Sequence, residues 1–122
     1  MNNKEKAVDF LQLVASGSVQ QAYVKYVDKD FRHHNPFFSG DADSLRVAME
    51  ENAKQNPEKT LTLQHVVEDG HLVVVHSWVK LKSDDIGVAL VHIFRFQNEL
   101  IAERWDIVQA VPENSPNEYG MF

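Results

Sequence analysis

The stretch IGVALVHIFRFQNELIAERWDIVQ, residues 86–109, predicts two β-strands joined by a short turn. Valine, isoleucine and aromatic residues, which favour strands, fill both of its halves. Between the halves lies Gln97-Asn98-Glu99, where Asn98 tolerates the left-handed backbone conformation that tight turns require. The stretch is therefore expected to form a β-hairpin.

Each strand of this hairpin is expected to carry ionisable residues among large apolar ones. Because side chains alternate between the two faces of a strand, one face of the first strand carries Leu90, His92, Phe94 and Phe96. The second strand divides into Leu100, Ala102, Arg104 and Asp106 on one face and Ile101, Glu103, Trp105 and Ile107 on the other. Apolar surroundings shift pKa values, so the hairpin is a candidate wall of a reactive pocket.

Upstream of the hairpin, the spacing of apolar residues predicts three helices and three further strands. The expected helices run from Asn2 or Asn3 to Gly17, from Ser18 to Val27, and from Ala42 or Asp43 to about Asn56. A short strand is expected at residues 30–34, just before the Asn35-Pro36 turn. Two-residue alternation predicts strands at 60–68 and 71–82, on either side of an Asp69-Gly70 turn.

The order helix, helix, short strand, helix and four long strands indicates an α+β fold. Because helices and strands are segregated, we expect a cone-shaped, curved antiparallel sheet packed against three N-terminal helices, with one end open. A chain of 122 residues, 43% of them hydrophobic, is sized for one domain that spans residues 1–122. The last segment, VPENSPNEYGMF, has two prolines and little periodicity, so a loop is expected there.

Composition excludes several classes of function. The chain has no cysteine, which rules out disulfides, thiolate metal sites and thiol nucleophiles. Its net charge of −6 and its scattered basic residues argue against binding to nucleic acid. The charged N-terminal run and the lack of a long apolar stretch predict neither a signal peptide nor a membrane segment, so we expect a cytoplasmic protein with no membrane partner.

Four pieces of the sequence carry a family resemblance: FRHHNP at 31–36, VVVHSWV at 73–79, VHIFRFQNELIAERWD at 91–106, and the final MF. With them, the chain resembles over its whole length the SnoaL-like polyketide cyclase branch of the nuclear transport factor 2-like superfamily. The resemblance implies a cone-shaped α+β barrel, usually a homodimer, with an apolar pocket. Better-known members catalyse an intramolecular aldol cyclisation there without a cofactor, using an acidic residue and a histidine for proton transfer.

Residue by residue, the resemblance singles out the HNP piece, the histidine of the VVVHS strand and the WD pair, which are His34, Asn35, His76, Trp105 and Asp106. The chain departs from its relatives at His92, where they commonly carry the aspartate that acts as the acid-base residue. Either His92 has taken over the proton transfer, as imidazole can near neutral pH, or the chain has a different activity.

The candidate catalytic residues, expected to face one cavity, are His76, His92, Asp106 and His34. His76 and His92 lie on neighbouring strands and share a pocket wall if the register aligns them. The competing interpretations are that His76 is a hydrogen-bonded core histidine and that Asp106 pairs with Arg95 or Arg104. His33, the alternate neighbour of His34, is expected to face solvent.

Aromatic residues and one amide supply the candidate lining of the cavity. The expected substrate-binding residues are Trp78, Phe31, Asn35, Phe94 and Trp105. Aromatic residues at strand spacing also occur as ordinary core, which is the competing interpretation. Histidine is a common metal ligand, but the histidine spacing here fits no metal motif, so neither a metal nor a cofactor is expected.

The favoured function is a cofactor-independent lyase or isomerase, of the aldol-condensation or cyclisation type, that acts on a small apolar carbonyl compound in a cone-shaped pocket. His76 or His92 would remove a proton next to the carbonyl, and Asp106 or His34 would orient that base or protonate the oxygen. One alternative is a non-catalytic dimeric module that binds a small molecule. Another is a dimerisation scaffold, supported by the apolar residues on the opposite strand face, Val73, Val75 and Val79.

Overall fold

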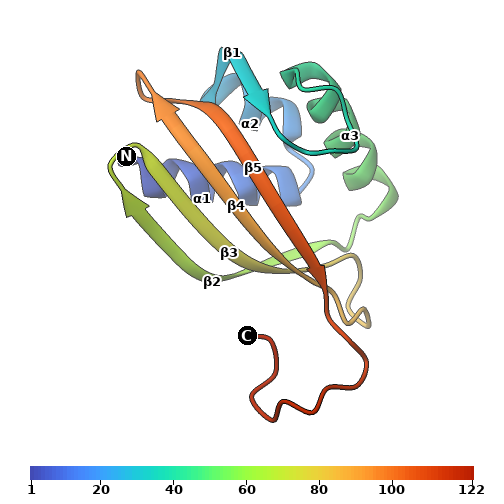
Figure 1. The fold of residues 1–122 in the computed structure, drawn as a ribbon. Coiled ribbons are helices and arrows are strands. Elements are labelled where there is room, and N and C mark those ends of the chain that lie inside the picture. The colour runs from blue at the N-terminus through green and yellow to red at the C-terminus, as the bar shows by residue number, and fades with distance from the viewer.

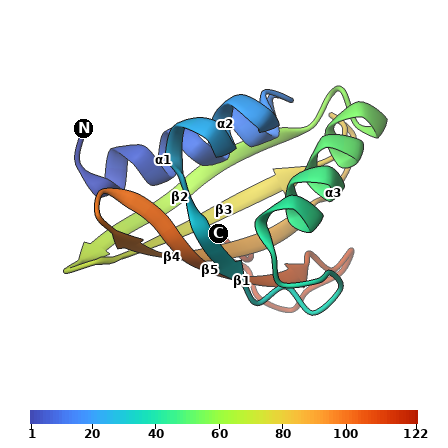
Figure 2. The ribbon, with the colours of Figure 1, turned by 90° about the horizontal axis from the view of Figure 1, so that it is seen from above.

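The order of elements agrees with the order expected from the sequence. The computed structural model describes residues 1–122. Its helices are α1 (Asn3–Ala15), α2 (Val19–Tyr26) and α3 (Ala42–Gln55). Its strands are β1 (Val27–His33), β2 (Thr60–Asp69), β3 (Leu72–Lys80), β4 (Val88–Gln97) and β5 (Leu100–Ala110). The α+β prediction is confirmed: three helices pack against a curved, open sheet (Figures 1 and 2).

The sheet is mixed rather than wholly antiparallel. Its strand order is β1-β5-β4-β3-β2, and strands β2 to β5 form the antiparallel meander that the sequence predicts. Strand β1 is the exception, because it pairs in parallel with β5 at the edge of the sheet (Figure 1). This pairing brings the loop after β1 beside the middle of the last strand, where His34 N–H donates to the carbonyl of Arg104 at 3.0 Å.

The β4–β5 hairpin closes through two residues with left-handed backbone, as the sequence predicted for the first of them. Asn98 has φ of 51° and Glu99 has φ of 68°. A two-residue turn with positive φ at both positions has the twist that matches the right-handed twist of the flanking strands. The Lys6 ammonium of α1 donates to the carbonyl of Glu99 at 3.0 Å, which ties the turn to the first helix.

Strand β5 does not alternate as the sequence predicted. The pairing with β4 runs from Arg95↔Glu103 to Phe96↔Ile101, so Ala102 is an extra residue in a β-bulge. Because of the bulge, Ile101 is fully buried in the core instead of lying on the face of Glu103 and Trp105. The predicted division of β5 into two faces therefore holds only after the bulge.

The core lies between the helices and the inner face of the sheet. Helix α1 begins with a capping box formed by Asn2 and Glu5 and buries one apolar stripe of Ala7, Phe10, Leu11 and Val14. The Phe10 ring meets Phe94 of β4 edge to face, with centroids 5.8 Å apart. Figure 2 shows the helices along one side of the sheet, and the buried core residues of β3 and β4 lie on this side.

The inner face of β3 corrects one expectation. Val73, Val75 and Val79 are no more than 5% exposed and point towards the helices. They therefore do not form a free apolar surface, and they give no support to the dimerisation scaffold that the sequence suggested.

The end of the C-terminal loop packs on the outer face of the sheet. Phe122 stacks on Trp78, with ring centroids 4.9 Å apart, and on His76, with centroids 5.8 Å apart. Figure 1 shows this last segment leaving β5 and turning back towards the sheet. Across the whole chain, the structure has no helix with both the length and the apolar character that crossing a lipid bilayer demands.

Candidate functional site

A cavity of about 240 Å³ lies between the helices and the inner face of the sheet, near the open end. Ten of its sixteen lining residues are hydrophobic, among them Leu11 and Val14 of α1 and Met49 of α3. The remaining lining residues include the polar or charged side chains Asn35, Asn52, Lys59, His92, Arg104 and Asp106. A mostly apolar hollow with a few convergent polar groups is the usual form of a small-molecule site.

His92 lies on the inner face of β4 and lines this cavity. It is 3% exposed, its ring stacks on that of Phe94, and its Nδ1 has no hydrogen-bond partner. Burial lowers the pKa of His92 well below its usual range, and the positive charges of Arg104 and Lys59 lower this pKa further. The imidazole is therefore neutral near pH 7, so that one ring nitrogen is free to accept a proton.

Asp106 is the direct cross-strand partner of His92 and lines the same cavity. Its Oδ2 accepts hydrogen bonds from Asn35 Nδ2 at 3.1 Å and from Arg104 Nη2 at 3.2 Å, whereas its Oδ1 has no partner. This ion pair with Arg104 is one of the two pairings, with Arg95 or Arg104, that the sequence offered as an alternative to a catalytic role for Asp106. The free Oδ1 nevertheless leaves half of this buried carboxylate available to another donor.

Asn35 reaches this site because of the parallel edge strand. It lies in the loop after β1, and the pairing of β1 with β5 carries that loop to Asp106, 71 residues away in sequence. Asn35, His92 and Asp106 are thus the three sequence-predicted residues that the structure brings together around one cavity.

His76 and Trp78 lie on the other side of the sheet, contrary to expectation. In the β3–β4 register His76 pairs with Val91, whereas His92 pairs with Val75. Paired residues share a face, so the two histidines point to opposite faces. His76 instead has its Nδ1 3.0 Å from Nδ1 of His65, and the Trp78 indole N–H donates to the carbonyl of Ile86.

His34 and Trp105 also lie away from the cavity. Their rings stack with centroids 5.0 Å apart, and His34 Nε2 is 2.6 Å from Oε2 of Glu103. Glu103 in addition accepts from Arg32 and Arg95, both at 3.0 Å. Hydrogen bonds from Arg32 first, then from His34 and Arg95, lower the pKa of Glu103 to about 2, against the opposing effect of burial.

Two predicted lining residues are core residues instead. Phe31 is 5% exposed and packs on Tyr23, and Phe94 is fully buried against Phe10. The expectation that His33 faces solvent is also wrong, because His33 is 5% exposed and its Nε2 lies 2.6 Å from the carbonyl of Ser39. All three residues are therefore buried parts of the packed interior and do not line the cavity.

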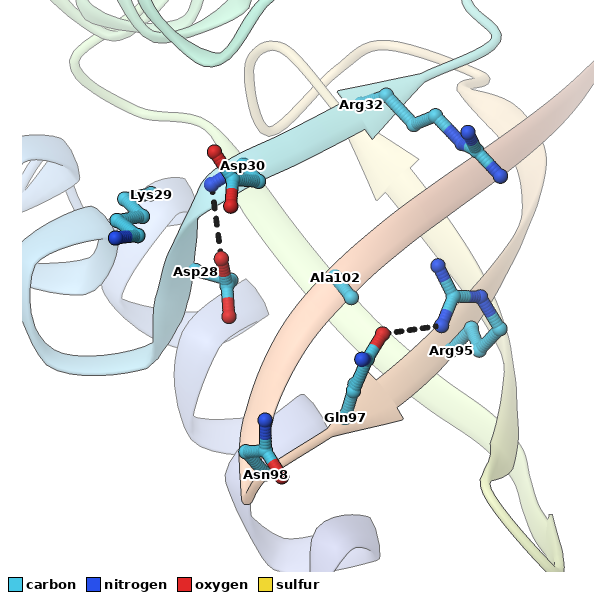
Figure 3. Close-up of a pocket in the computed structure, with 8 residues that line it drawn as sticks. All are labelled: Asp28, Lys29, Asp30, Arg32, Arg95, Gln97, Asn98 and Ala102. Atoms are coloured by element: carbon cyan, nitrogen blue, oxygen red, sulfur yellow. Dashed lines mark hydrogen bonds between the residues drawn. The ribbon is translucent and has the colours of Figure 1, made fainter.

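A second hollow, of about 460 Å³, lies on the outer face over Ala102, at the bulge. Figure 3 shows that it is lined by Arg32 and Arg95 on either side of β5 and by a polar rim that includes Asp28, Asp30 and Gln97. Both arginines are already paired with Glu103, and Arg95 also donates to Gln97 at 3.1 Å. Its two arginines are therefore already paired with Glu103, whereas Arg104 of the cavity has two donors without a partner.

Three cavity residues were missed or only partly recognised in the sequence. Arg104 was considered only as an ion-pair partner, although its place two residues before Asp106 puts both side chains on one strand face. Lys59 and Asn52 were not considered. Lys59 follows a Pro57 turn with no pattern around it, so its place in the cavity depends on how α3 packs.

No cluster of three or more His, Asp or Glu side chains in the structure has the geometry to hold a metal ion.

Comparison with known proteins places these features in a family. A family model described as a SnoaL-like domain matches residues 7–104. No protein among those with curated descriptions matched the sequence.

Solved structures share the fold at low sequence identity. TsrD from Streptomyces laurentii is 19% identical and has a TM-score of 0.71, with 88% of this chain and 90% of TsrD covered. A cystatin-fold protein from Novosphingobium aromaticivorans is 16% identical, with a TM-score of 0.74 and coverage of 88% and 98%. IdmH from Streptomyces antibioticus, provisionally described as a polyketide cyclase, is 16% identical, with a TM-score of 0.68 and coverage of 88% and 92%.

Proposed function

Because the chain belongs to the SnoaL-like domain family, we propose that it is a cofactor-independent lyase or isomerase that acts on a small carbonyl compound in the cavity. The observation that carries this proposal is the cross-strand pair of His92 and Asp106 within a mostly apolar lining. Paired ionisable groups with different environments are typical of acid-base sites.

In the proposed reaction, a ring nitrogen of His92 takes a proton from the carbon next to the carbonyl group. This requires the neutral tautomer that carries its own proton on the other ring nitrogen. The electrons of the broken C–H bond form an enolate, and the nearby carboxylate of Asp106 stabilises the imidazolium that results. If the enolate is conjugated with a C=C bond, its far carbon takes the proton back from the imidazolium, which is an isomerisation. Alternatively its carbon attacks a second carbonyl of the same molecule, whose oxygen then takes the proton from the imidazolium, which is an aldol cyclisation.

The test is deuterium exchange at the carbon next to the carbonyl, measured by NMR on a panel of cyclic ketones and 1,3-diketones in deuterated water. The chain is expected to accelerate exchange for at least one of them, and His92→Ala should remove the acceleration. His76→Ala is the matched control, because it removes an imidazole from the outer face. Equal loss in both variants, or no loss in either, would contradict the assignment of His92.

The second candidate is a binding module without turnover, favoured by the predominance of apolar residues in the lining. It predicts that small hydrophobic ligands raise the melting temperature while no candidate substrate undergoes exchange. Thermal unfolding with a ligand library separates the two functions, since only the enzyme combines ligand binding with exchange.

We also propose that the chain forms a homodimer, which the family resemblance implies. Exposed apolar residues on the outer face of the sheet support it, including Val67 at 58% and Ile107 at 61% exposed. Such residues are costly on a monomer if they form a contiguous patch. Light scattering after size-exclusion chromatography would give the mass directly, and the mass of a monomer would exclude the proposal.

A further inference from the structure

We propose that the cavity holds its ligand by a carboxylate group placed between Arg104 and Lys59, so that the natural substrate is an oxo acid and not a neutral ketone. This inference rests on the proposed function of the same site and narrows its substrate class. It follows from buried donors that lack partners and from the balance of charges in the lining.

The first observation is the incomplete hydrogen bonding of Arg104. Its side chain is 4% exposed, and only Nη2 has a partner, the carboxylate of Asp106. Its Nε and Nη1 are buried without any acceptor. A guanidinium has five N–H donors and no acceptor, and leaving them unpaired in a buried position is costly. Because Arg104 lines the cavity, an anion bound there would lie beside this incompletely paired guanidinium.

The second observation is a further cation in the same lining. Lys59 is half-buried, and its ammonium donates to Asn52 Oδ1 at 2.7 Å, which is a neutral partner. Burial lowers the pKa of Lys59, and the positive charge of Arg104 lowers it further. The lining therefore concentrates positive charge without a counterion for Lys59.

The charges of the lining identify the class of anion. The only carboxylate among the lining residues is Asp106, against the two cations Lys59 and Arg104, and His92 is neutral. One positive charge remains in excess. A ligand with a single negative charge balances it, whereas a neutral ligand leaves it uncompensated and a dianion such as a phosphate monoester exceeds it.

A bound carboxylate would also act on the proposed base. Arg104 and Lys59 both lie close enough to His92 to lower its pKa. Negative charge on the ligand would offset them and return this pKa towards its usual range, which makes the imidazole a stronger base when substrate is present. The acidic C–H of a small oxo acid lies only a few bonds from its carboxylate, so both groups fit one cavity.

The test is isothermal titration calorimetry with three probes of similar shape: cyclohexanecarboxylate, cyclohexanecarboxamide and cyclohexyl phosphate. The carboxylate is expected to bind about tenfold more tightly than the amide, the gain typical of a charge-assisted hydrogen bond. Equal affinity for carboxylate and amide, or tighter binding of the phosphate, would overturn the proposal.

Variants assign the effect to the two cations. Lys59→Met should weaken carboxylate binding about tenfold and leave amide binding unchanged. Lys54→Met, the same change at an exposed position of α3, is the matched control and should alter neither. Arg104→Met should have a larger effect but also removes a buried ion pair, so Lys59→Met is the decisive variant. An unchanged carboxylate preference in Lys59→Met would overturn the role of Lys59.

These measurements separate the inference from the proposed function. Carboxylate preference without exchange on any oxo acid would refute the enzyme and retain the anion site. Exchange on neutral ketones without carboxylate preference would retain the enzyme and refute the anion site.

Discussion

The two faces of β5 each carry a buried carboxylate, and the two differ in how completely they are hydrogen-bonded. Glu103 on the outer face accepts from Arg32, Arg95 and His34, and both of its oxygens are used. Asp106 on the inner face accepts only at Oδ2, and its Oδ1 is free beside a neutral imidazole. A saturated carboxylate holds strands together, whereas one with a free oxygen in a cavity remains available for chemistry.

The largest effect is expected from removing the inner pair. His92→Ala and Asp106→Asn should each reduce deuterium exchange by about a hundredfold or more, the range typical of a general base. Glu103→Gln should leave exchange within a few fold, because Glu103 does not face the cavity. NMR exchange rates on the same substrate, with circular dichroism to verify folding, provide the measurement. A comparable loss in Glu103→Gln would break the distinction between the two faces.

Removing the outer carboxylate should instead lower stability. Glu103→Gln is expected to lower the free energy of unfolding by about 2 kcal/mol, because it weakens several charge-assisted hydrogen bonds. The loss is no larger because the partners are exposed and solvent screens their charges. Chemical denaturation with urea measures it. His76→Ala on the same outer face, where no carboxylate is involved, is the control and should lower stability by less than Glu103→Gln does.

The Glu103 contribution has a defined pH dependence. The folded protein holds the pKa of this carboxyl at about 2, below the ordinary value of 4.5. A carboxyl whose pKa is lower in the folded than in the unfolded protein stabilises the fold at a pH above its ordinary pKa. This stabilisation is lost as the pH falls from that value towards 2. Urea denaturation should therefore show that the free energy of unfolding of the wild type falls between neutral pH and about pH 3, and that it falls less in Glu103→Gln. The same pH dependence in both proteins would contradict this assignment.

A smaller effect is expected from Asn35, which donates one of the two hydrogen bonds to Asp106. Asn35→Ala removes that donor and should lower exchange by about tenfold, since the loss of one hydrogen bond to a charged group corresponds to about that factor. Asn35→Asp, of nearly the same size, should lower it further because it places a second negative charge beside Asp106. Equal rates in wild type and Asn35→Ala would show that Arg104 alone orients the carboxylate.

The smallest expected effect is the response of activity to mild acid. Because burial and the positive charges of Arg104 and Lys59 keep the pKa of His92 well below its usual range, the base stays neutral as the pH falls through about 6.5. The exchange rate, extrapolated to low substrate concentration, should therefore stay nearly constant between about pH 7.5 and pH 6. A half-maximal rate near pH 6.5 would indicate an ordinary, solvated histidine.

The fold was predictable from the sequence because its signals are local. The hairpin residues, the caps and the helical spacing of the Phe10 stripe each specify their own element. The placement of His92 beside Asp106 could also be anticipated, because the two residues lie on the strands of one predicted hairpin, whereas Asn35 was singled out only through the family resemblance. No local signal gave the parallel pairing of β1, which depends on where the chain returns after α2.

The wrong predictions about the site concern strands in which the alternation of side chains does not specify which face lies towards the helices. Both faces of β3 are apolar, so periodicity did not decide whether His76 and Trp78 or Val73 and Val75 face the helices. In β5 the single bulge at Ala102 reversed the expected sides of the residues before it. Lys59 could not be found at all, because it enters the cavity only through the packing of α3 against the sheet.

The edge position of β1 has a consequence for synthesis of the chain. The amide of Asn35 and the carboxylate of Asp106 are separated by 71 residues. A chain growing from its N-terminus holds the helices and four strands before β5 exists, yet it has no partner for β1 until that last strand is complete. On the ribosome, the candidate site therefore cannot be assembled before β5 has been made, and a nascent chain truncated before β5 should not display the proposed activity.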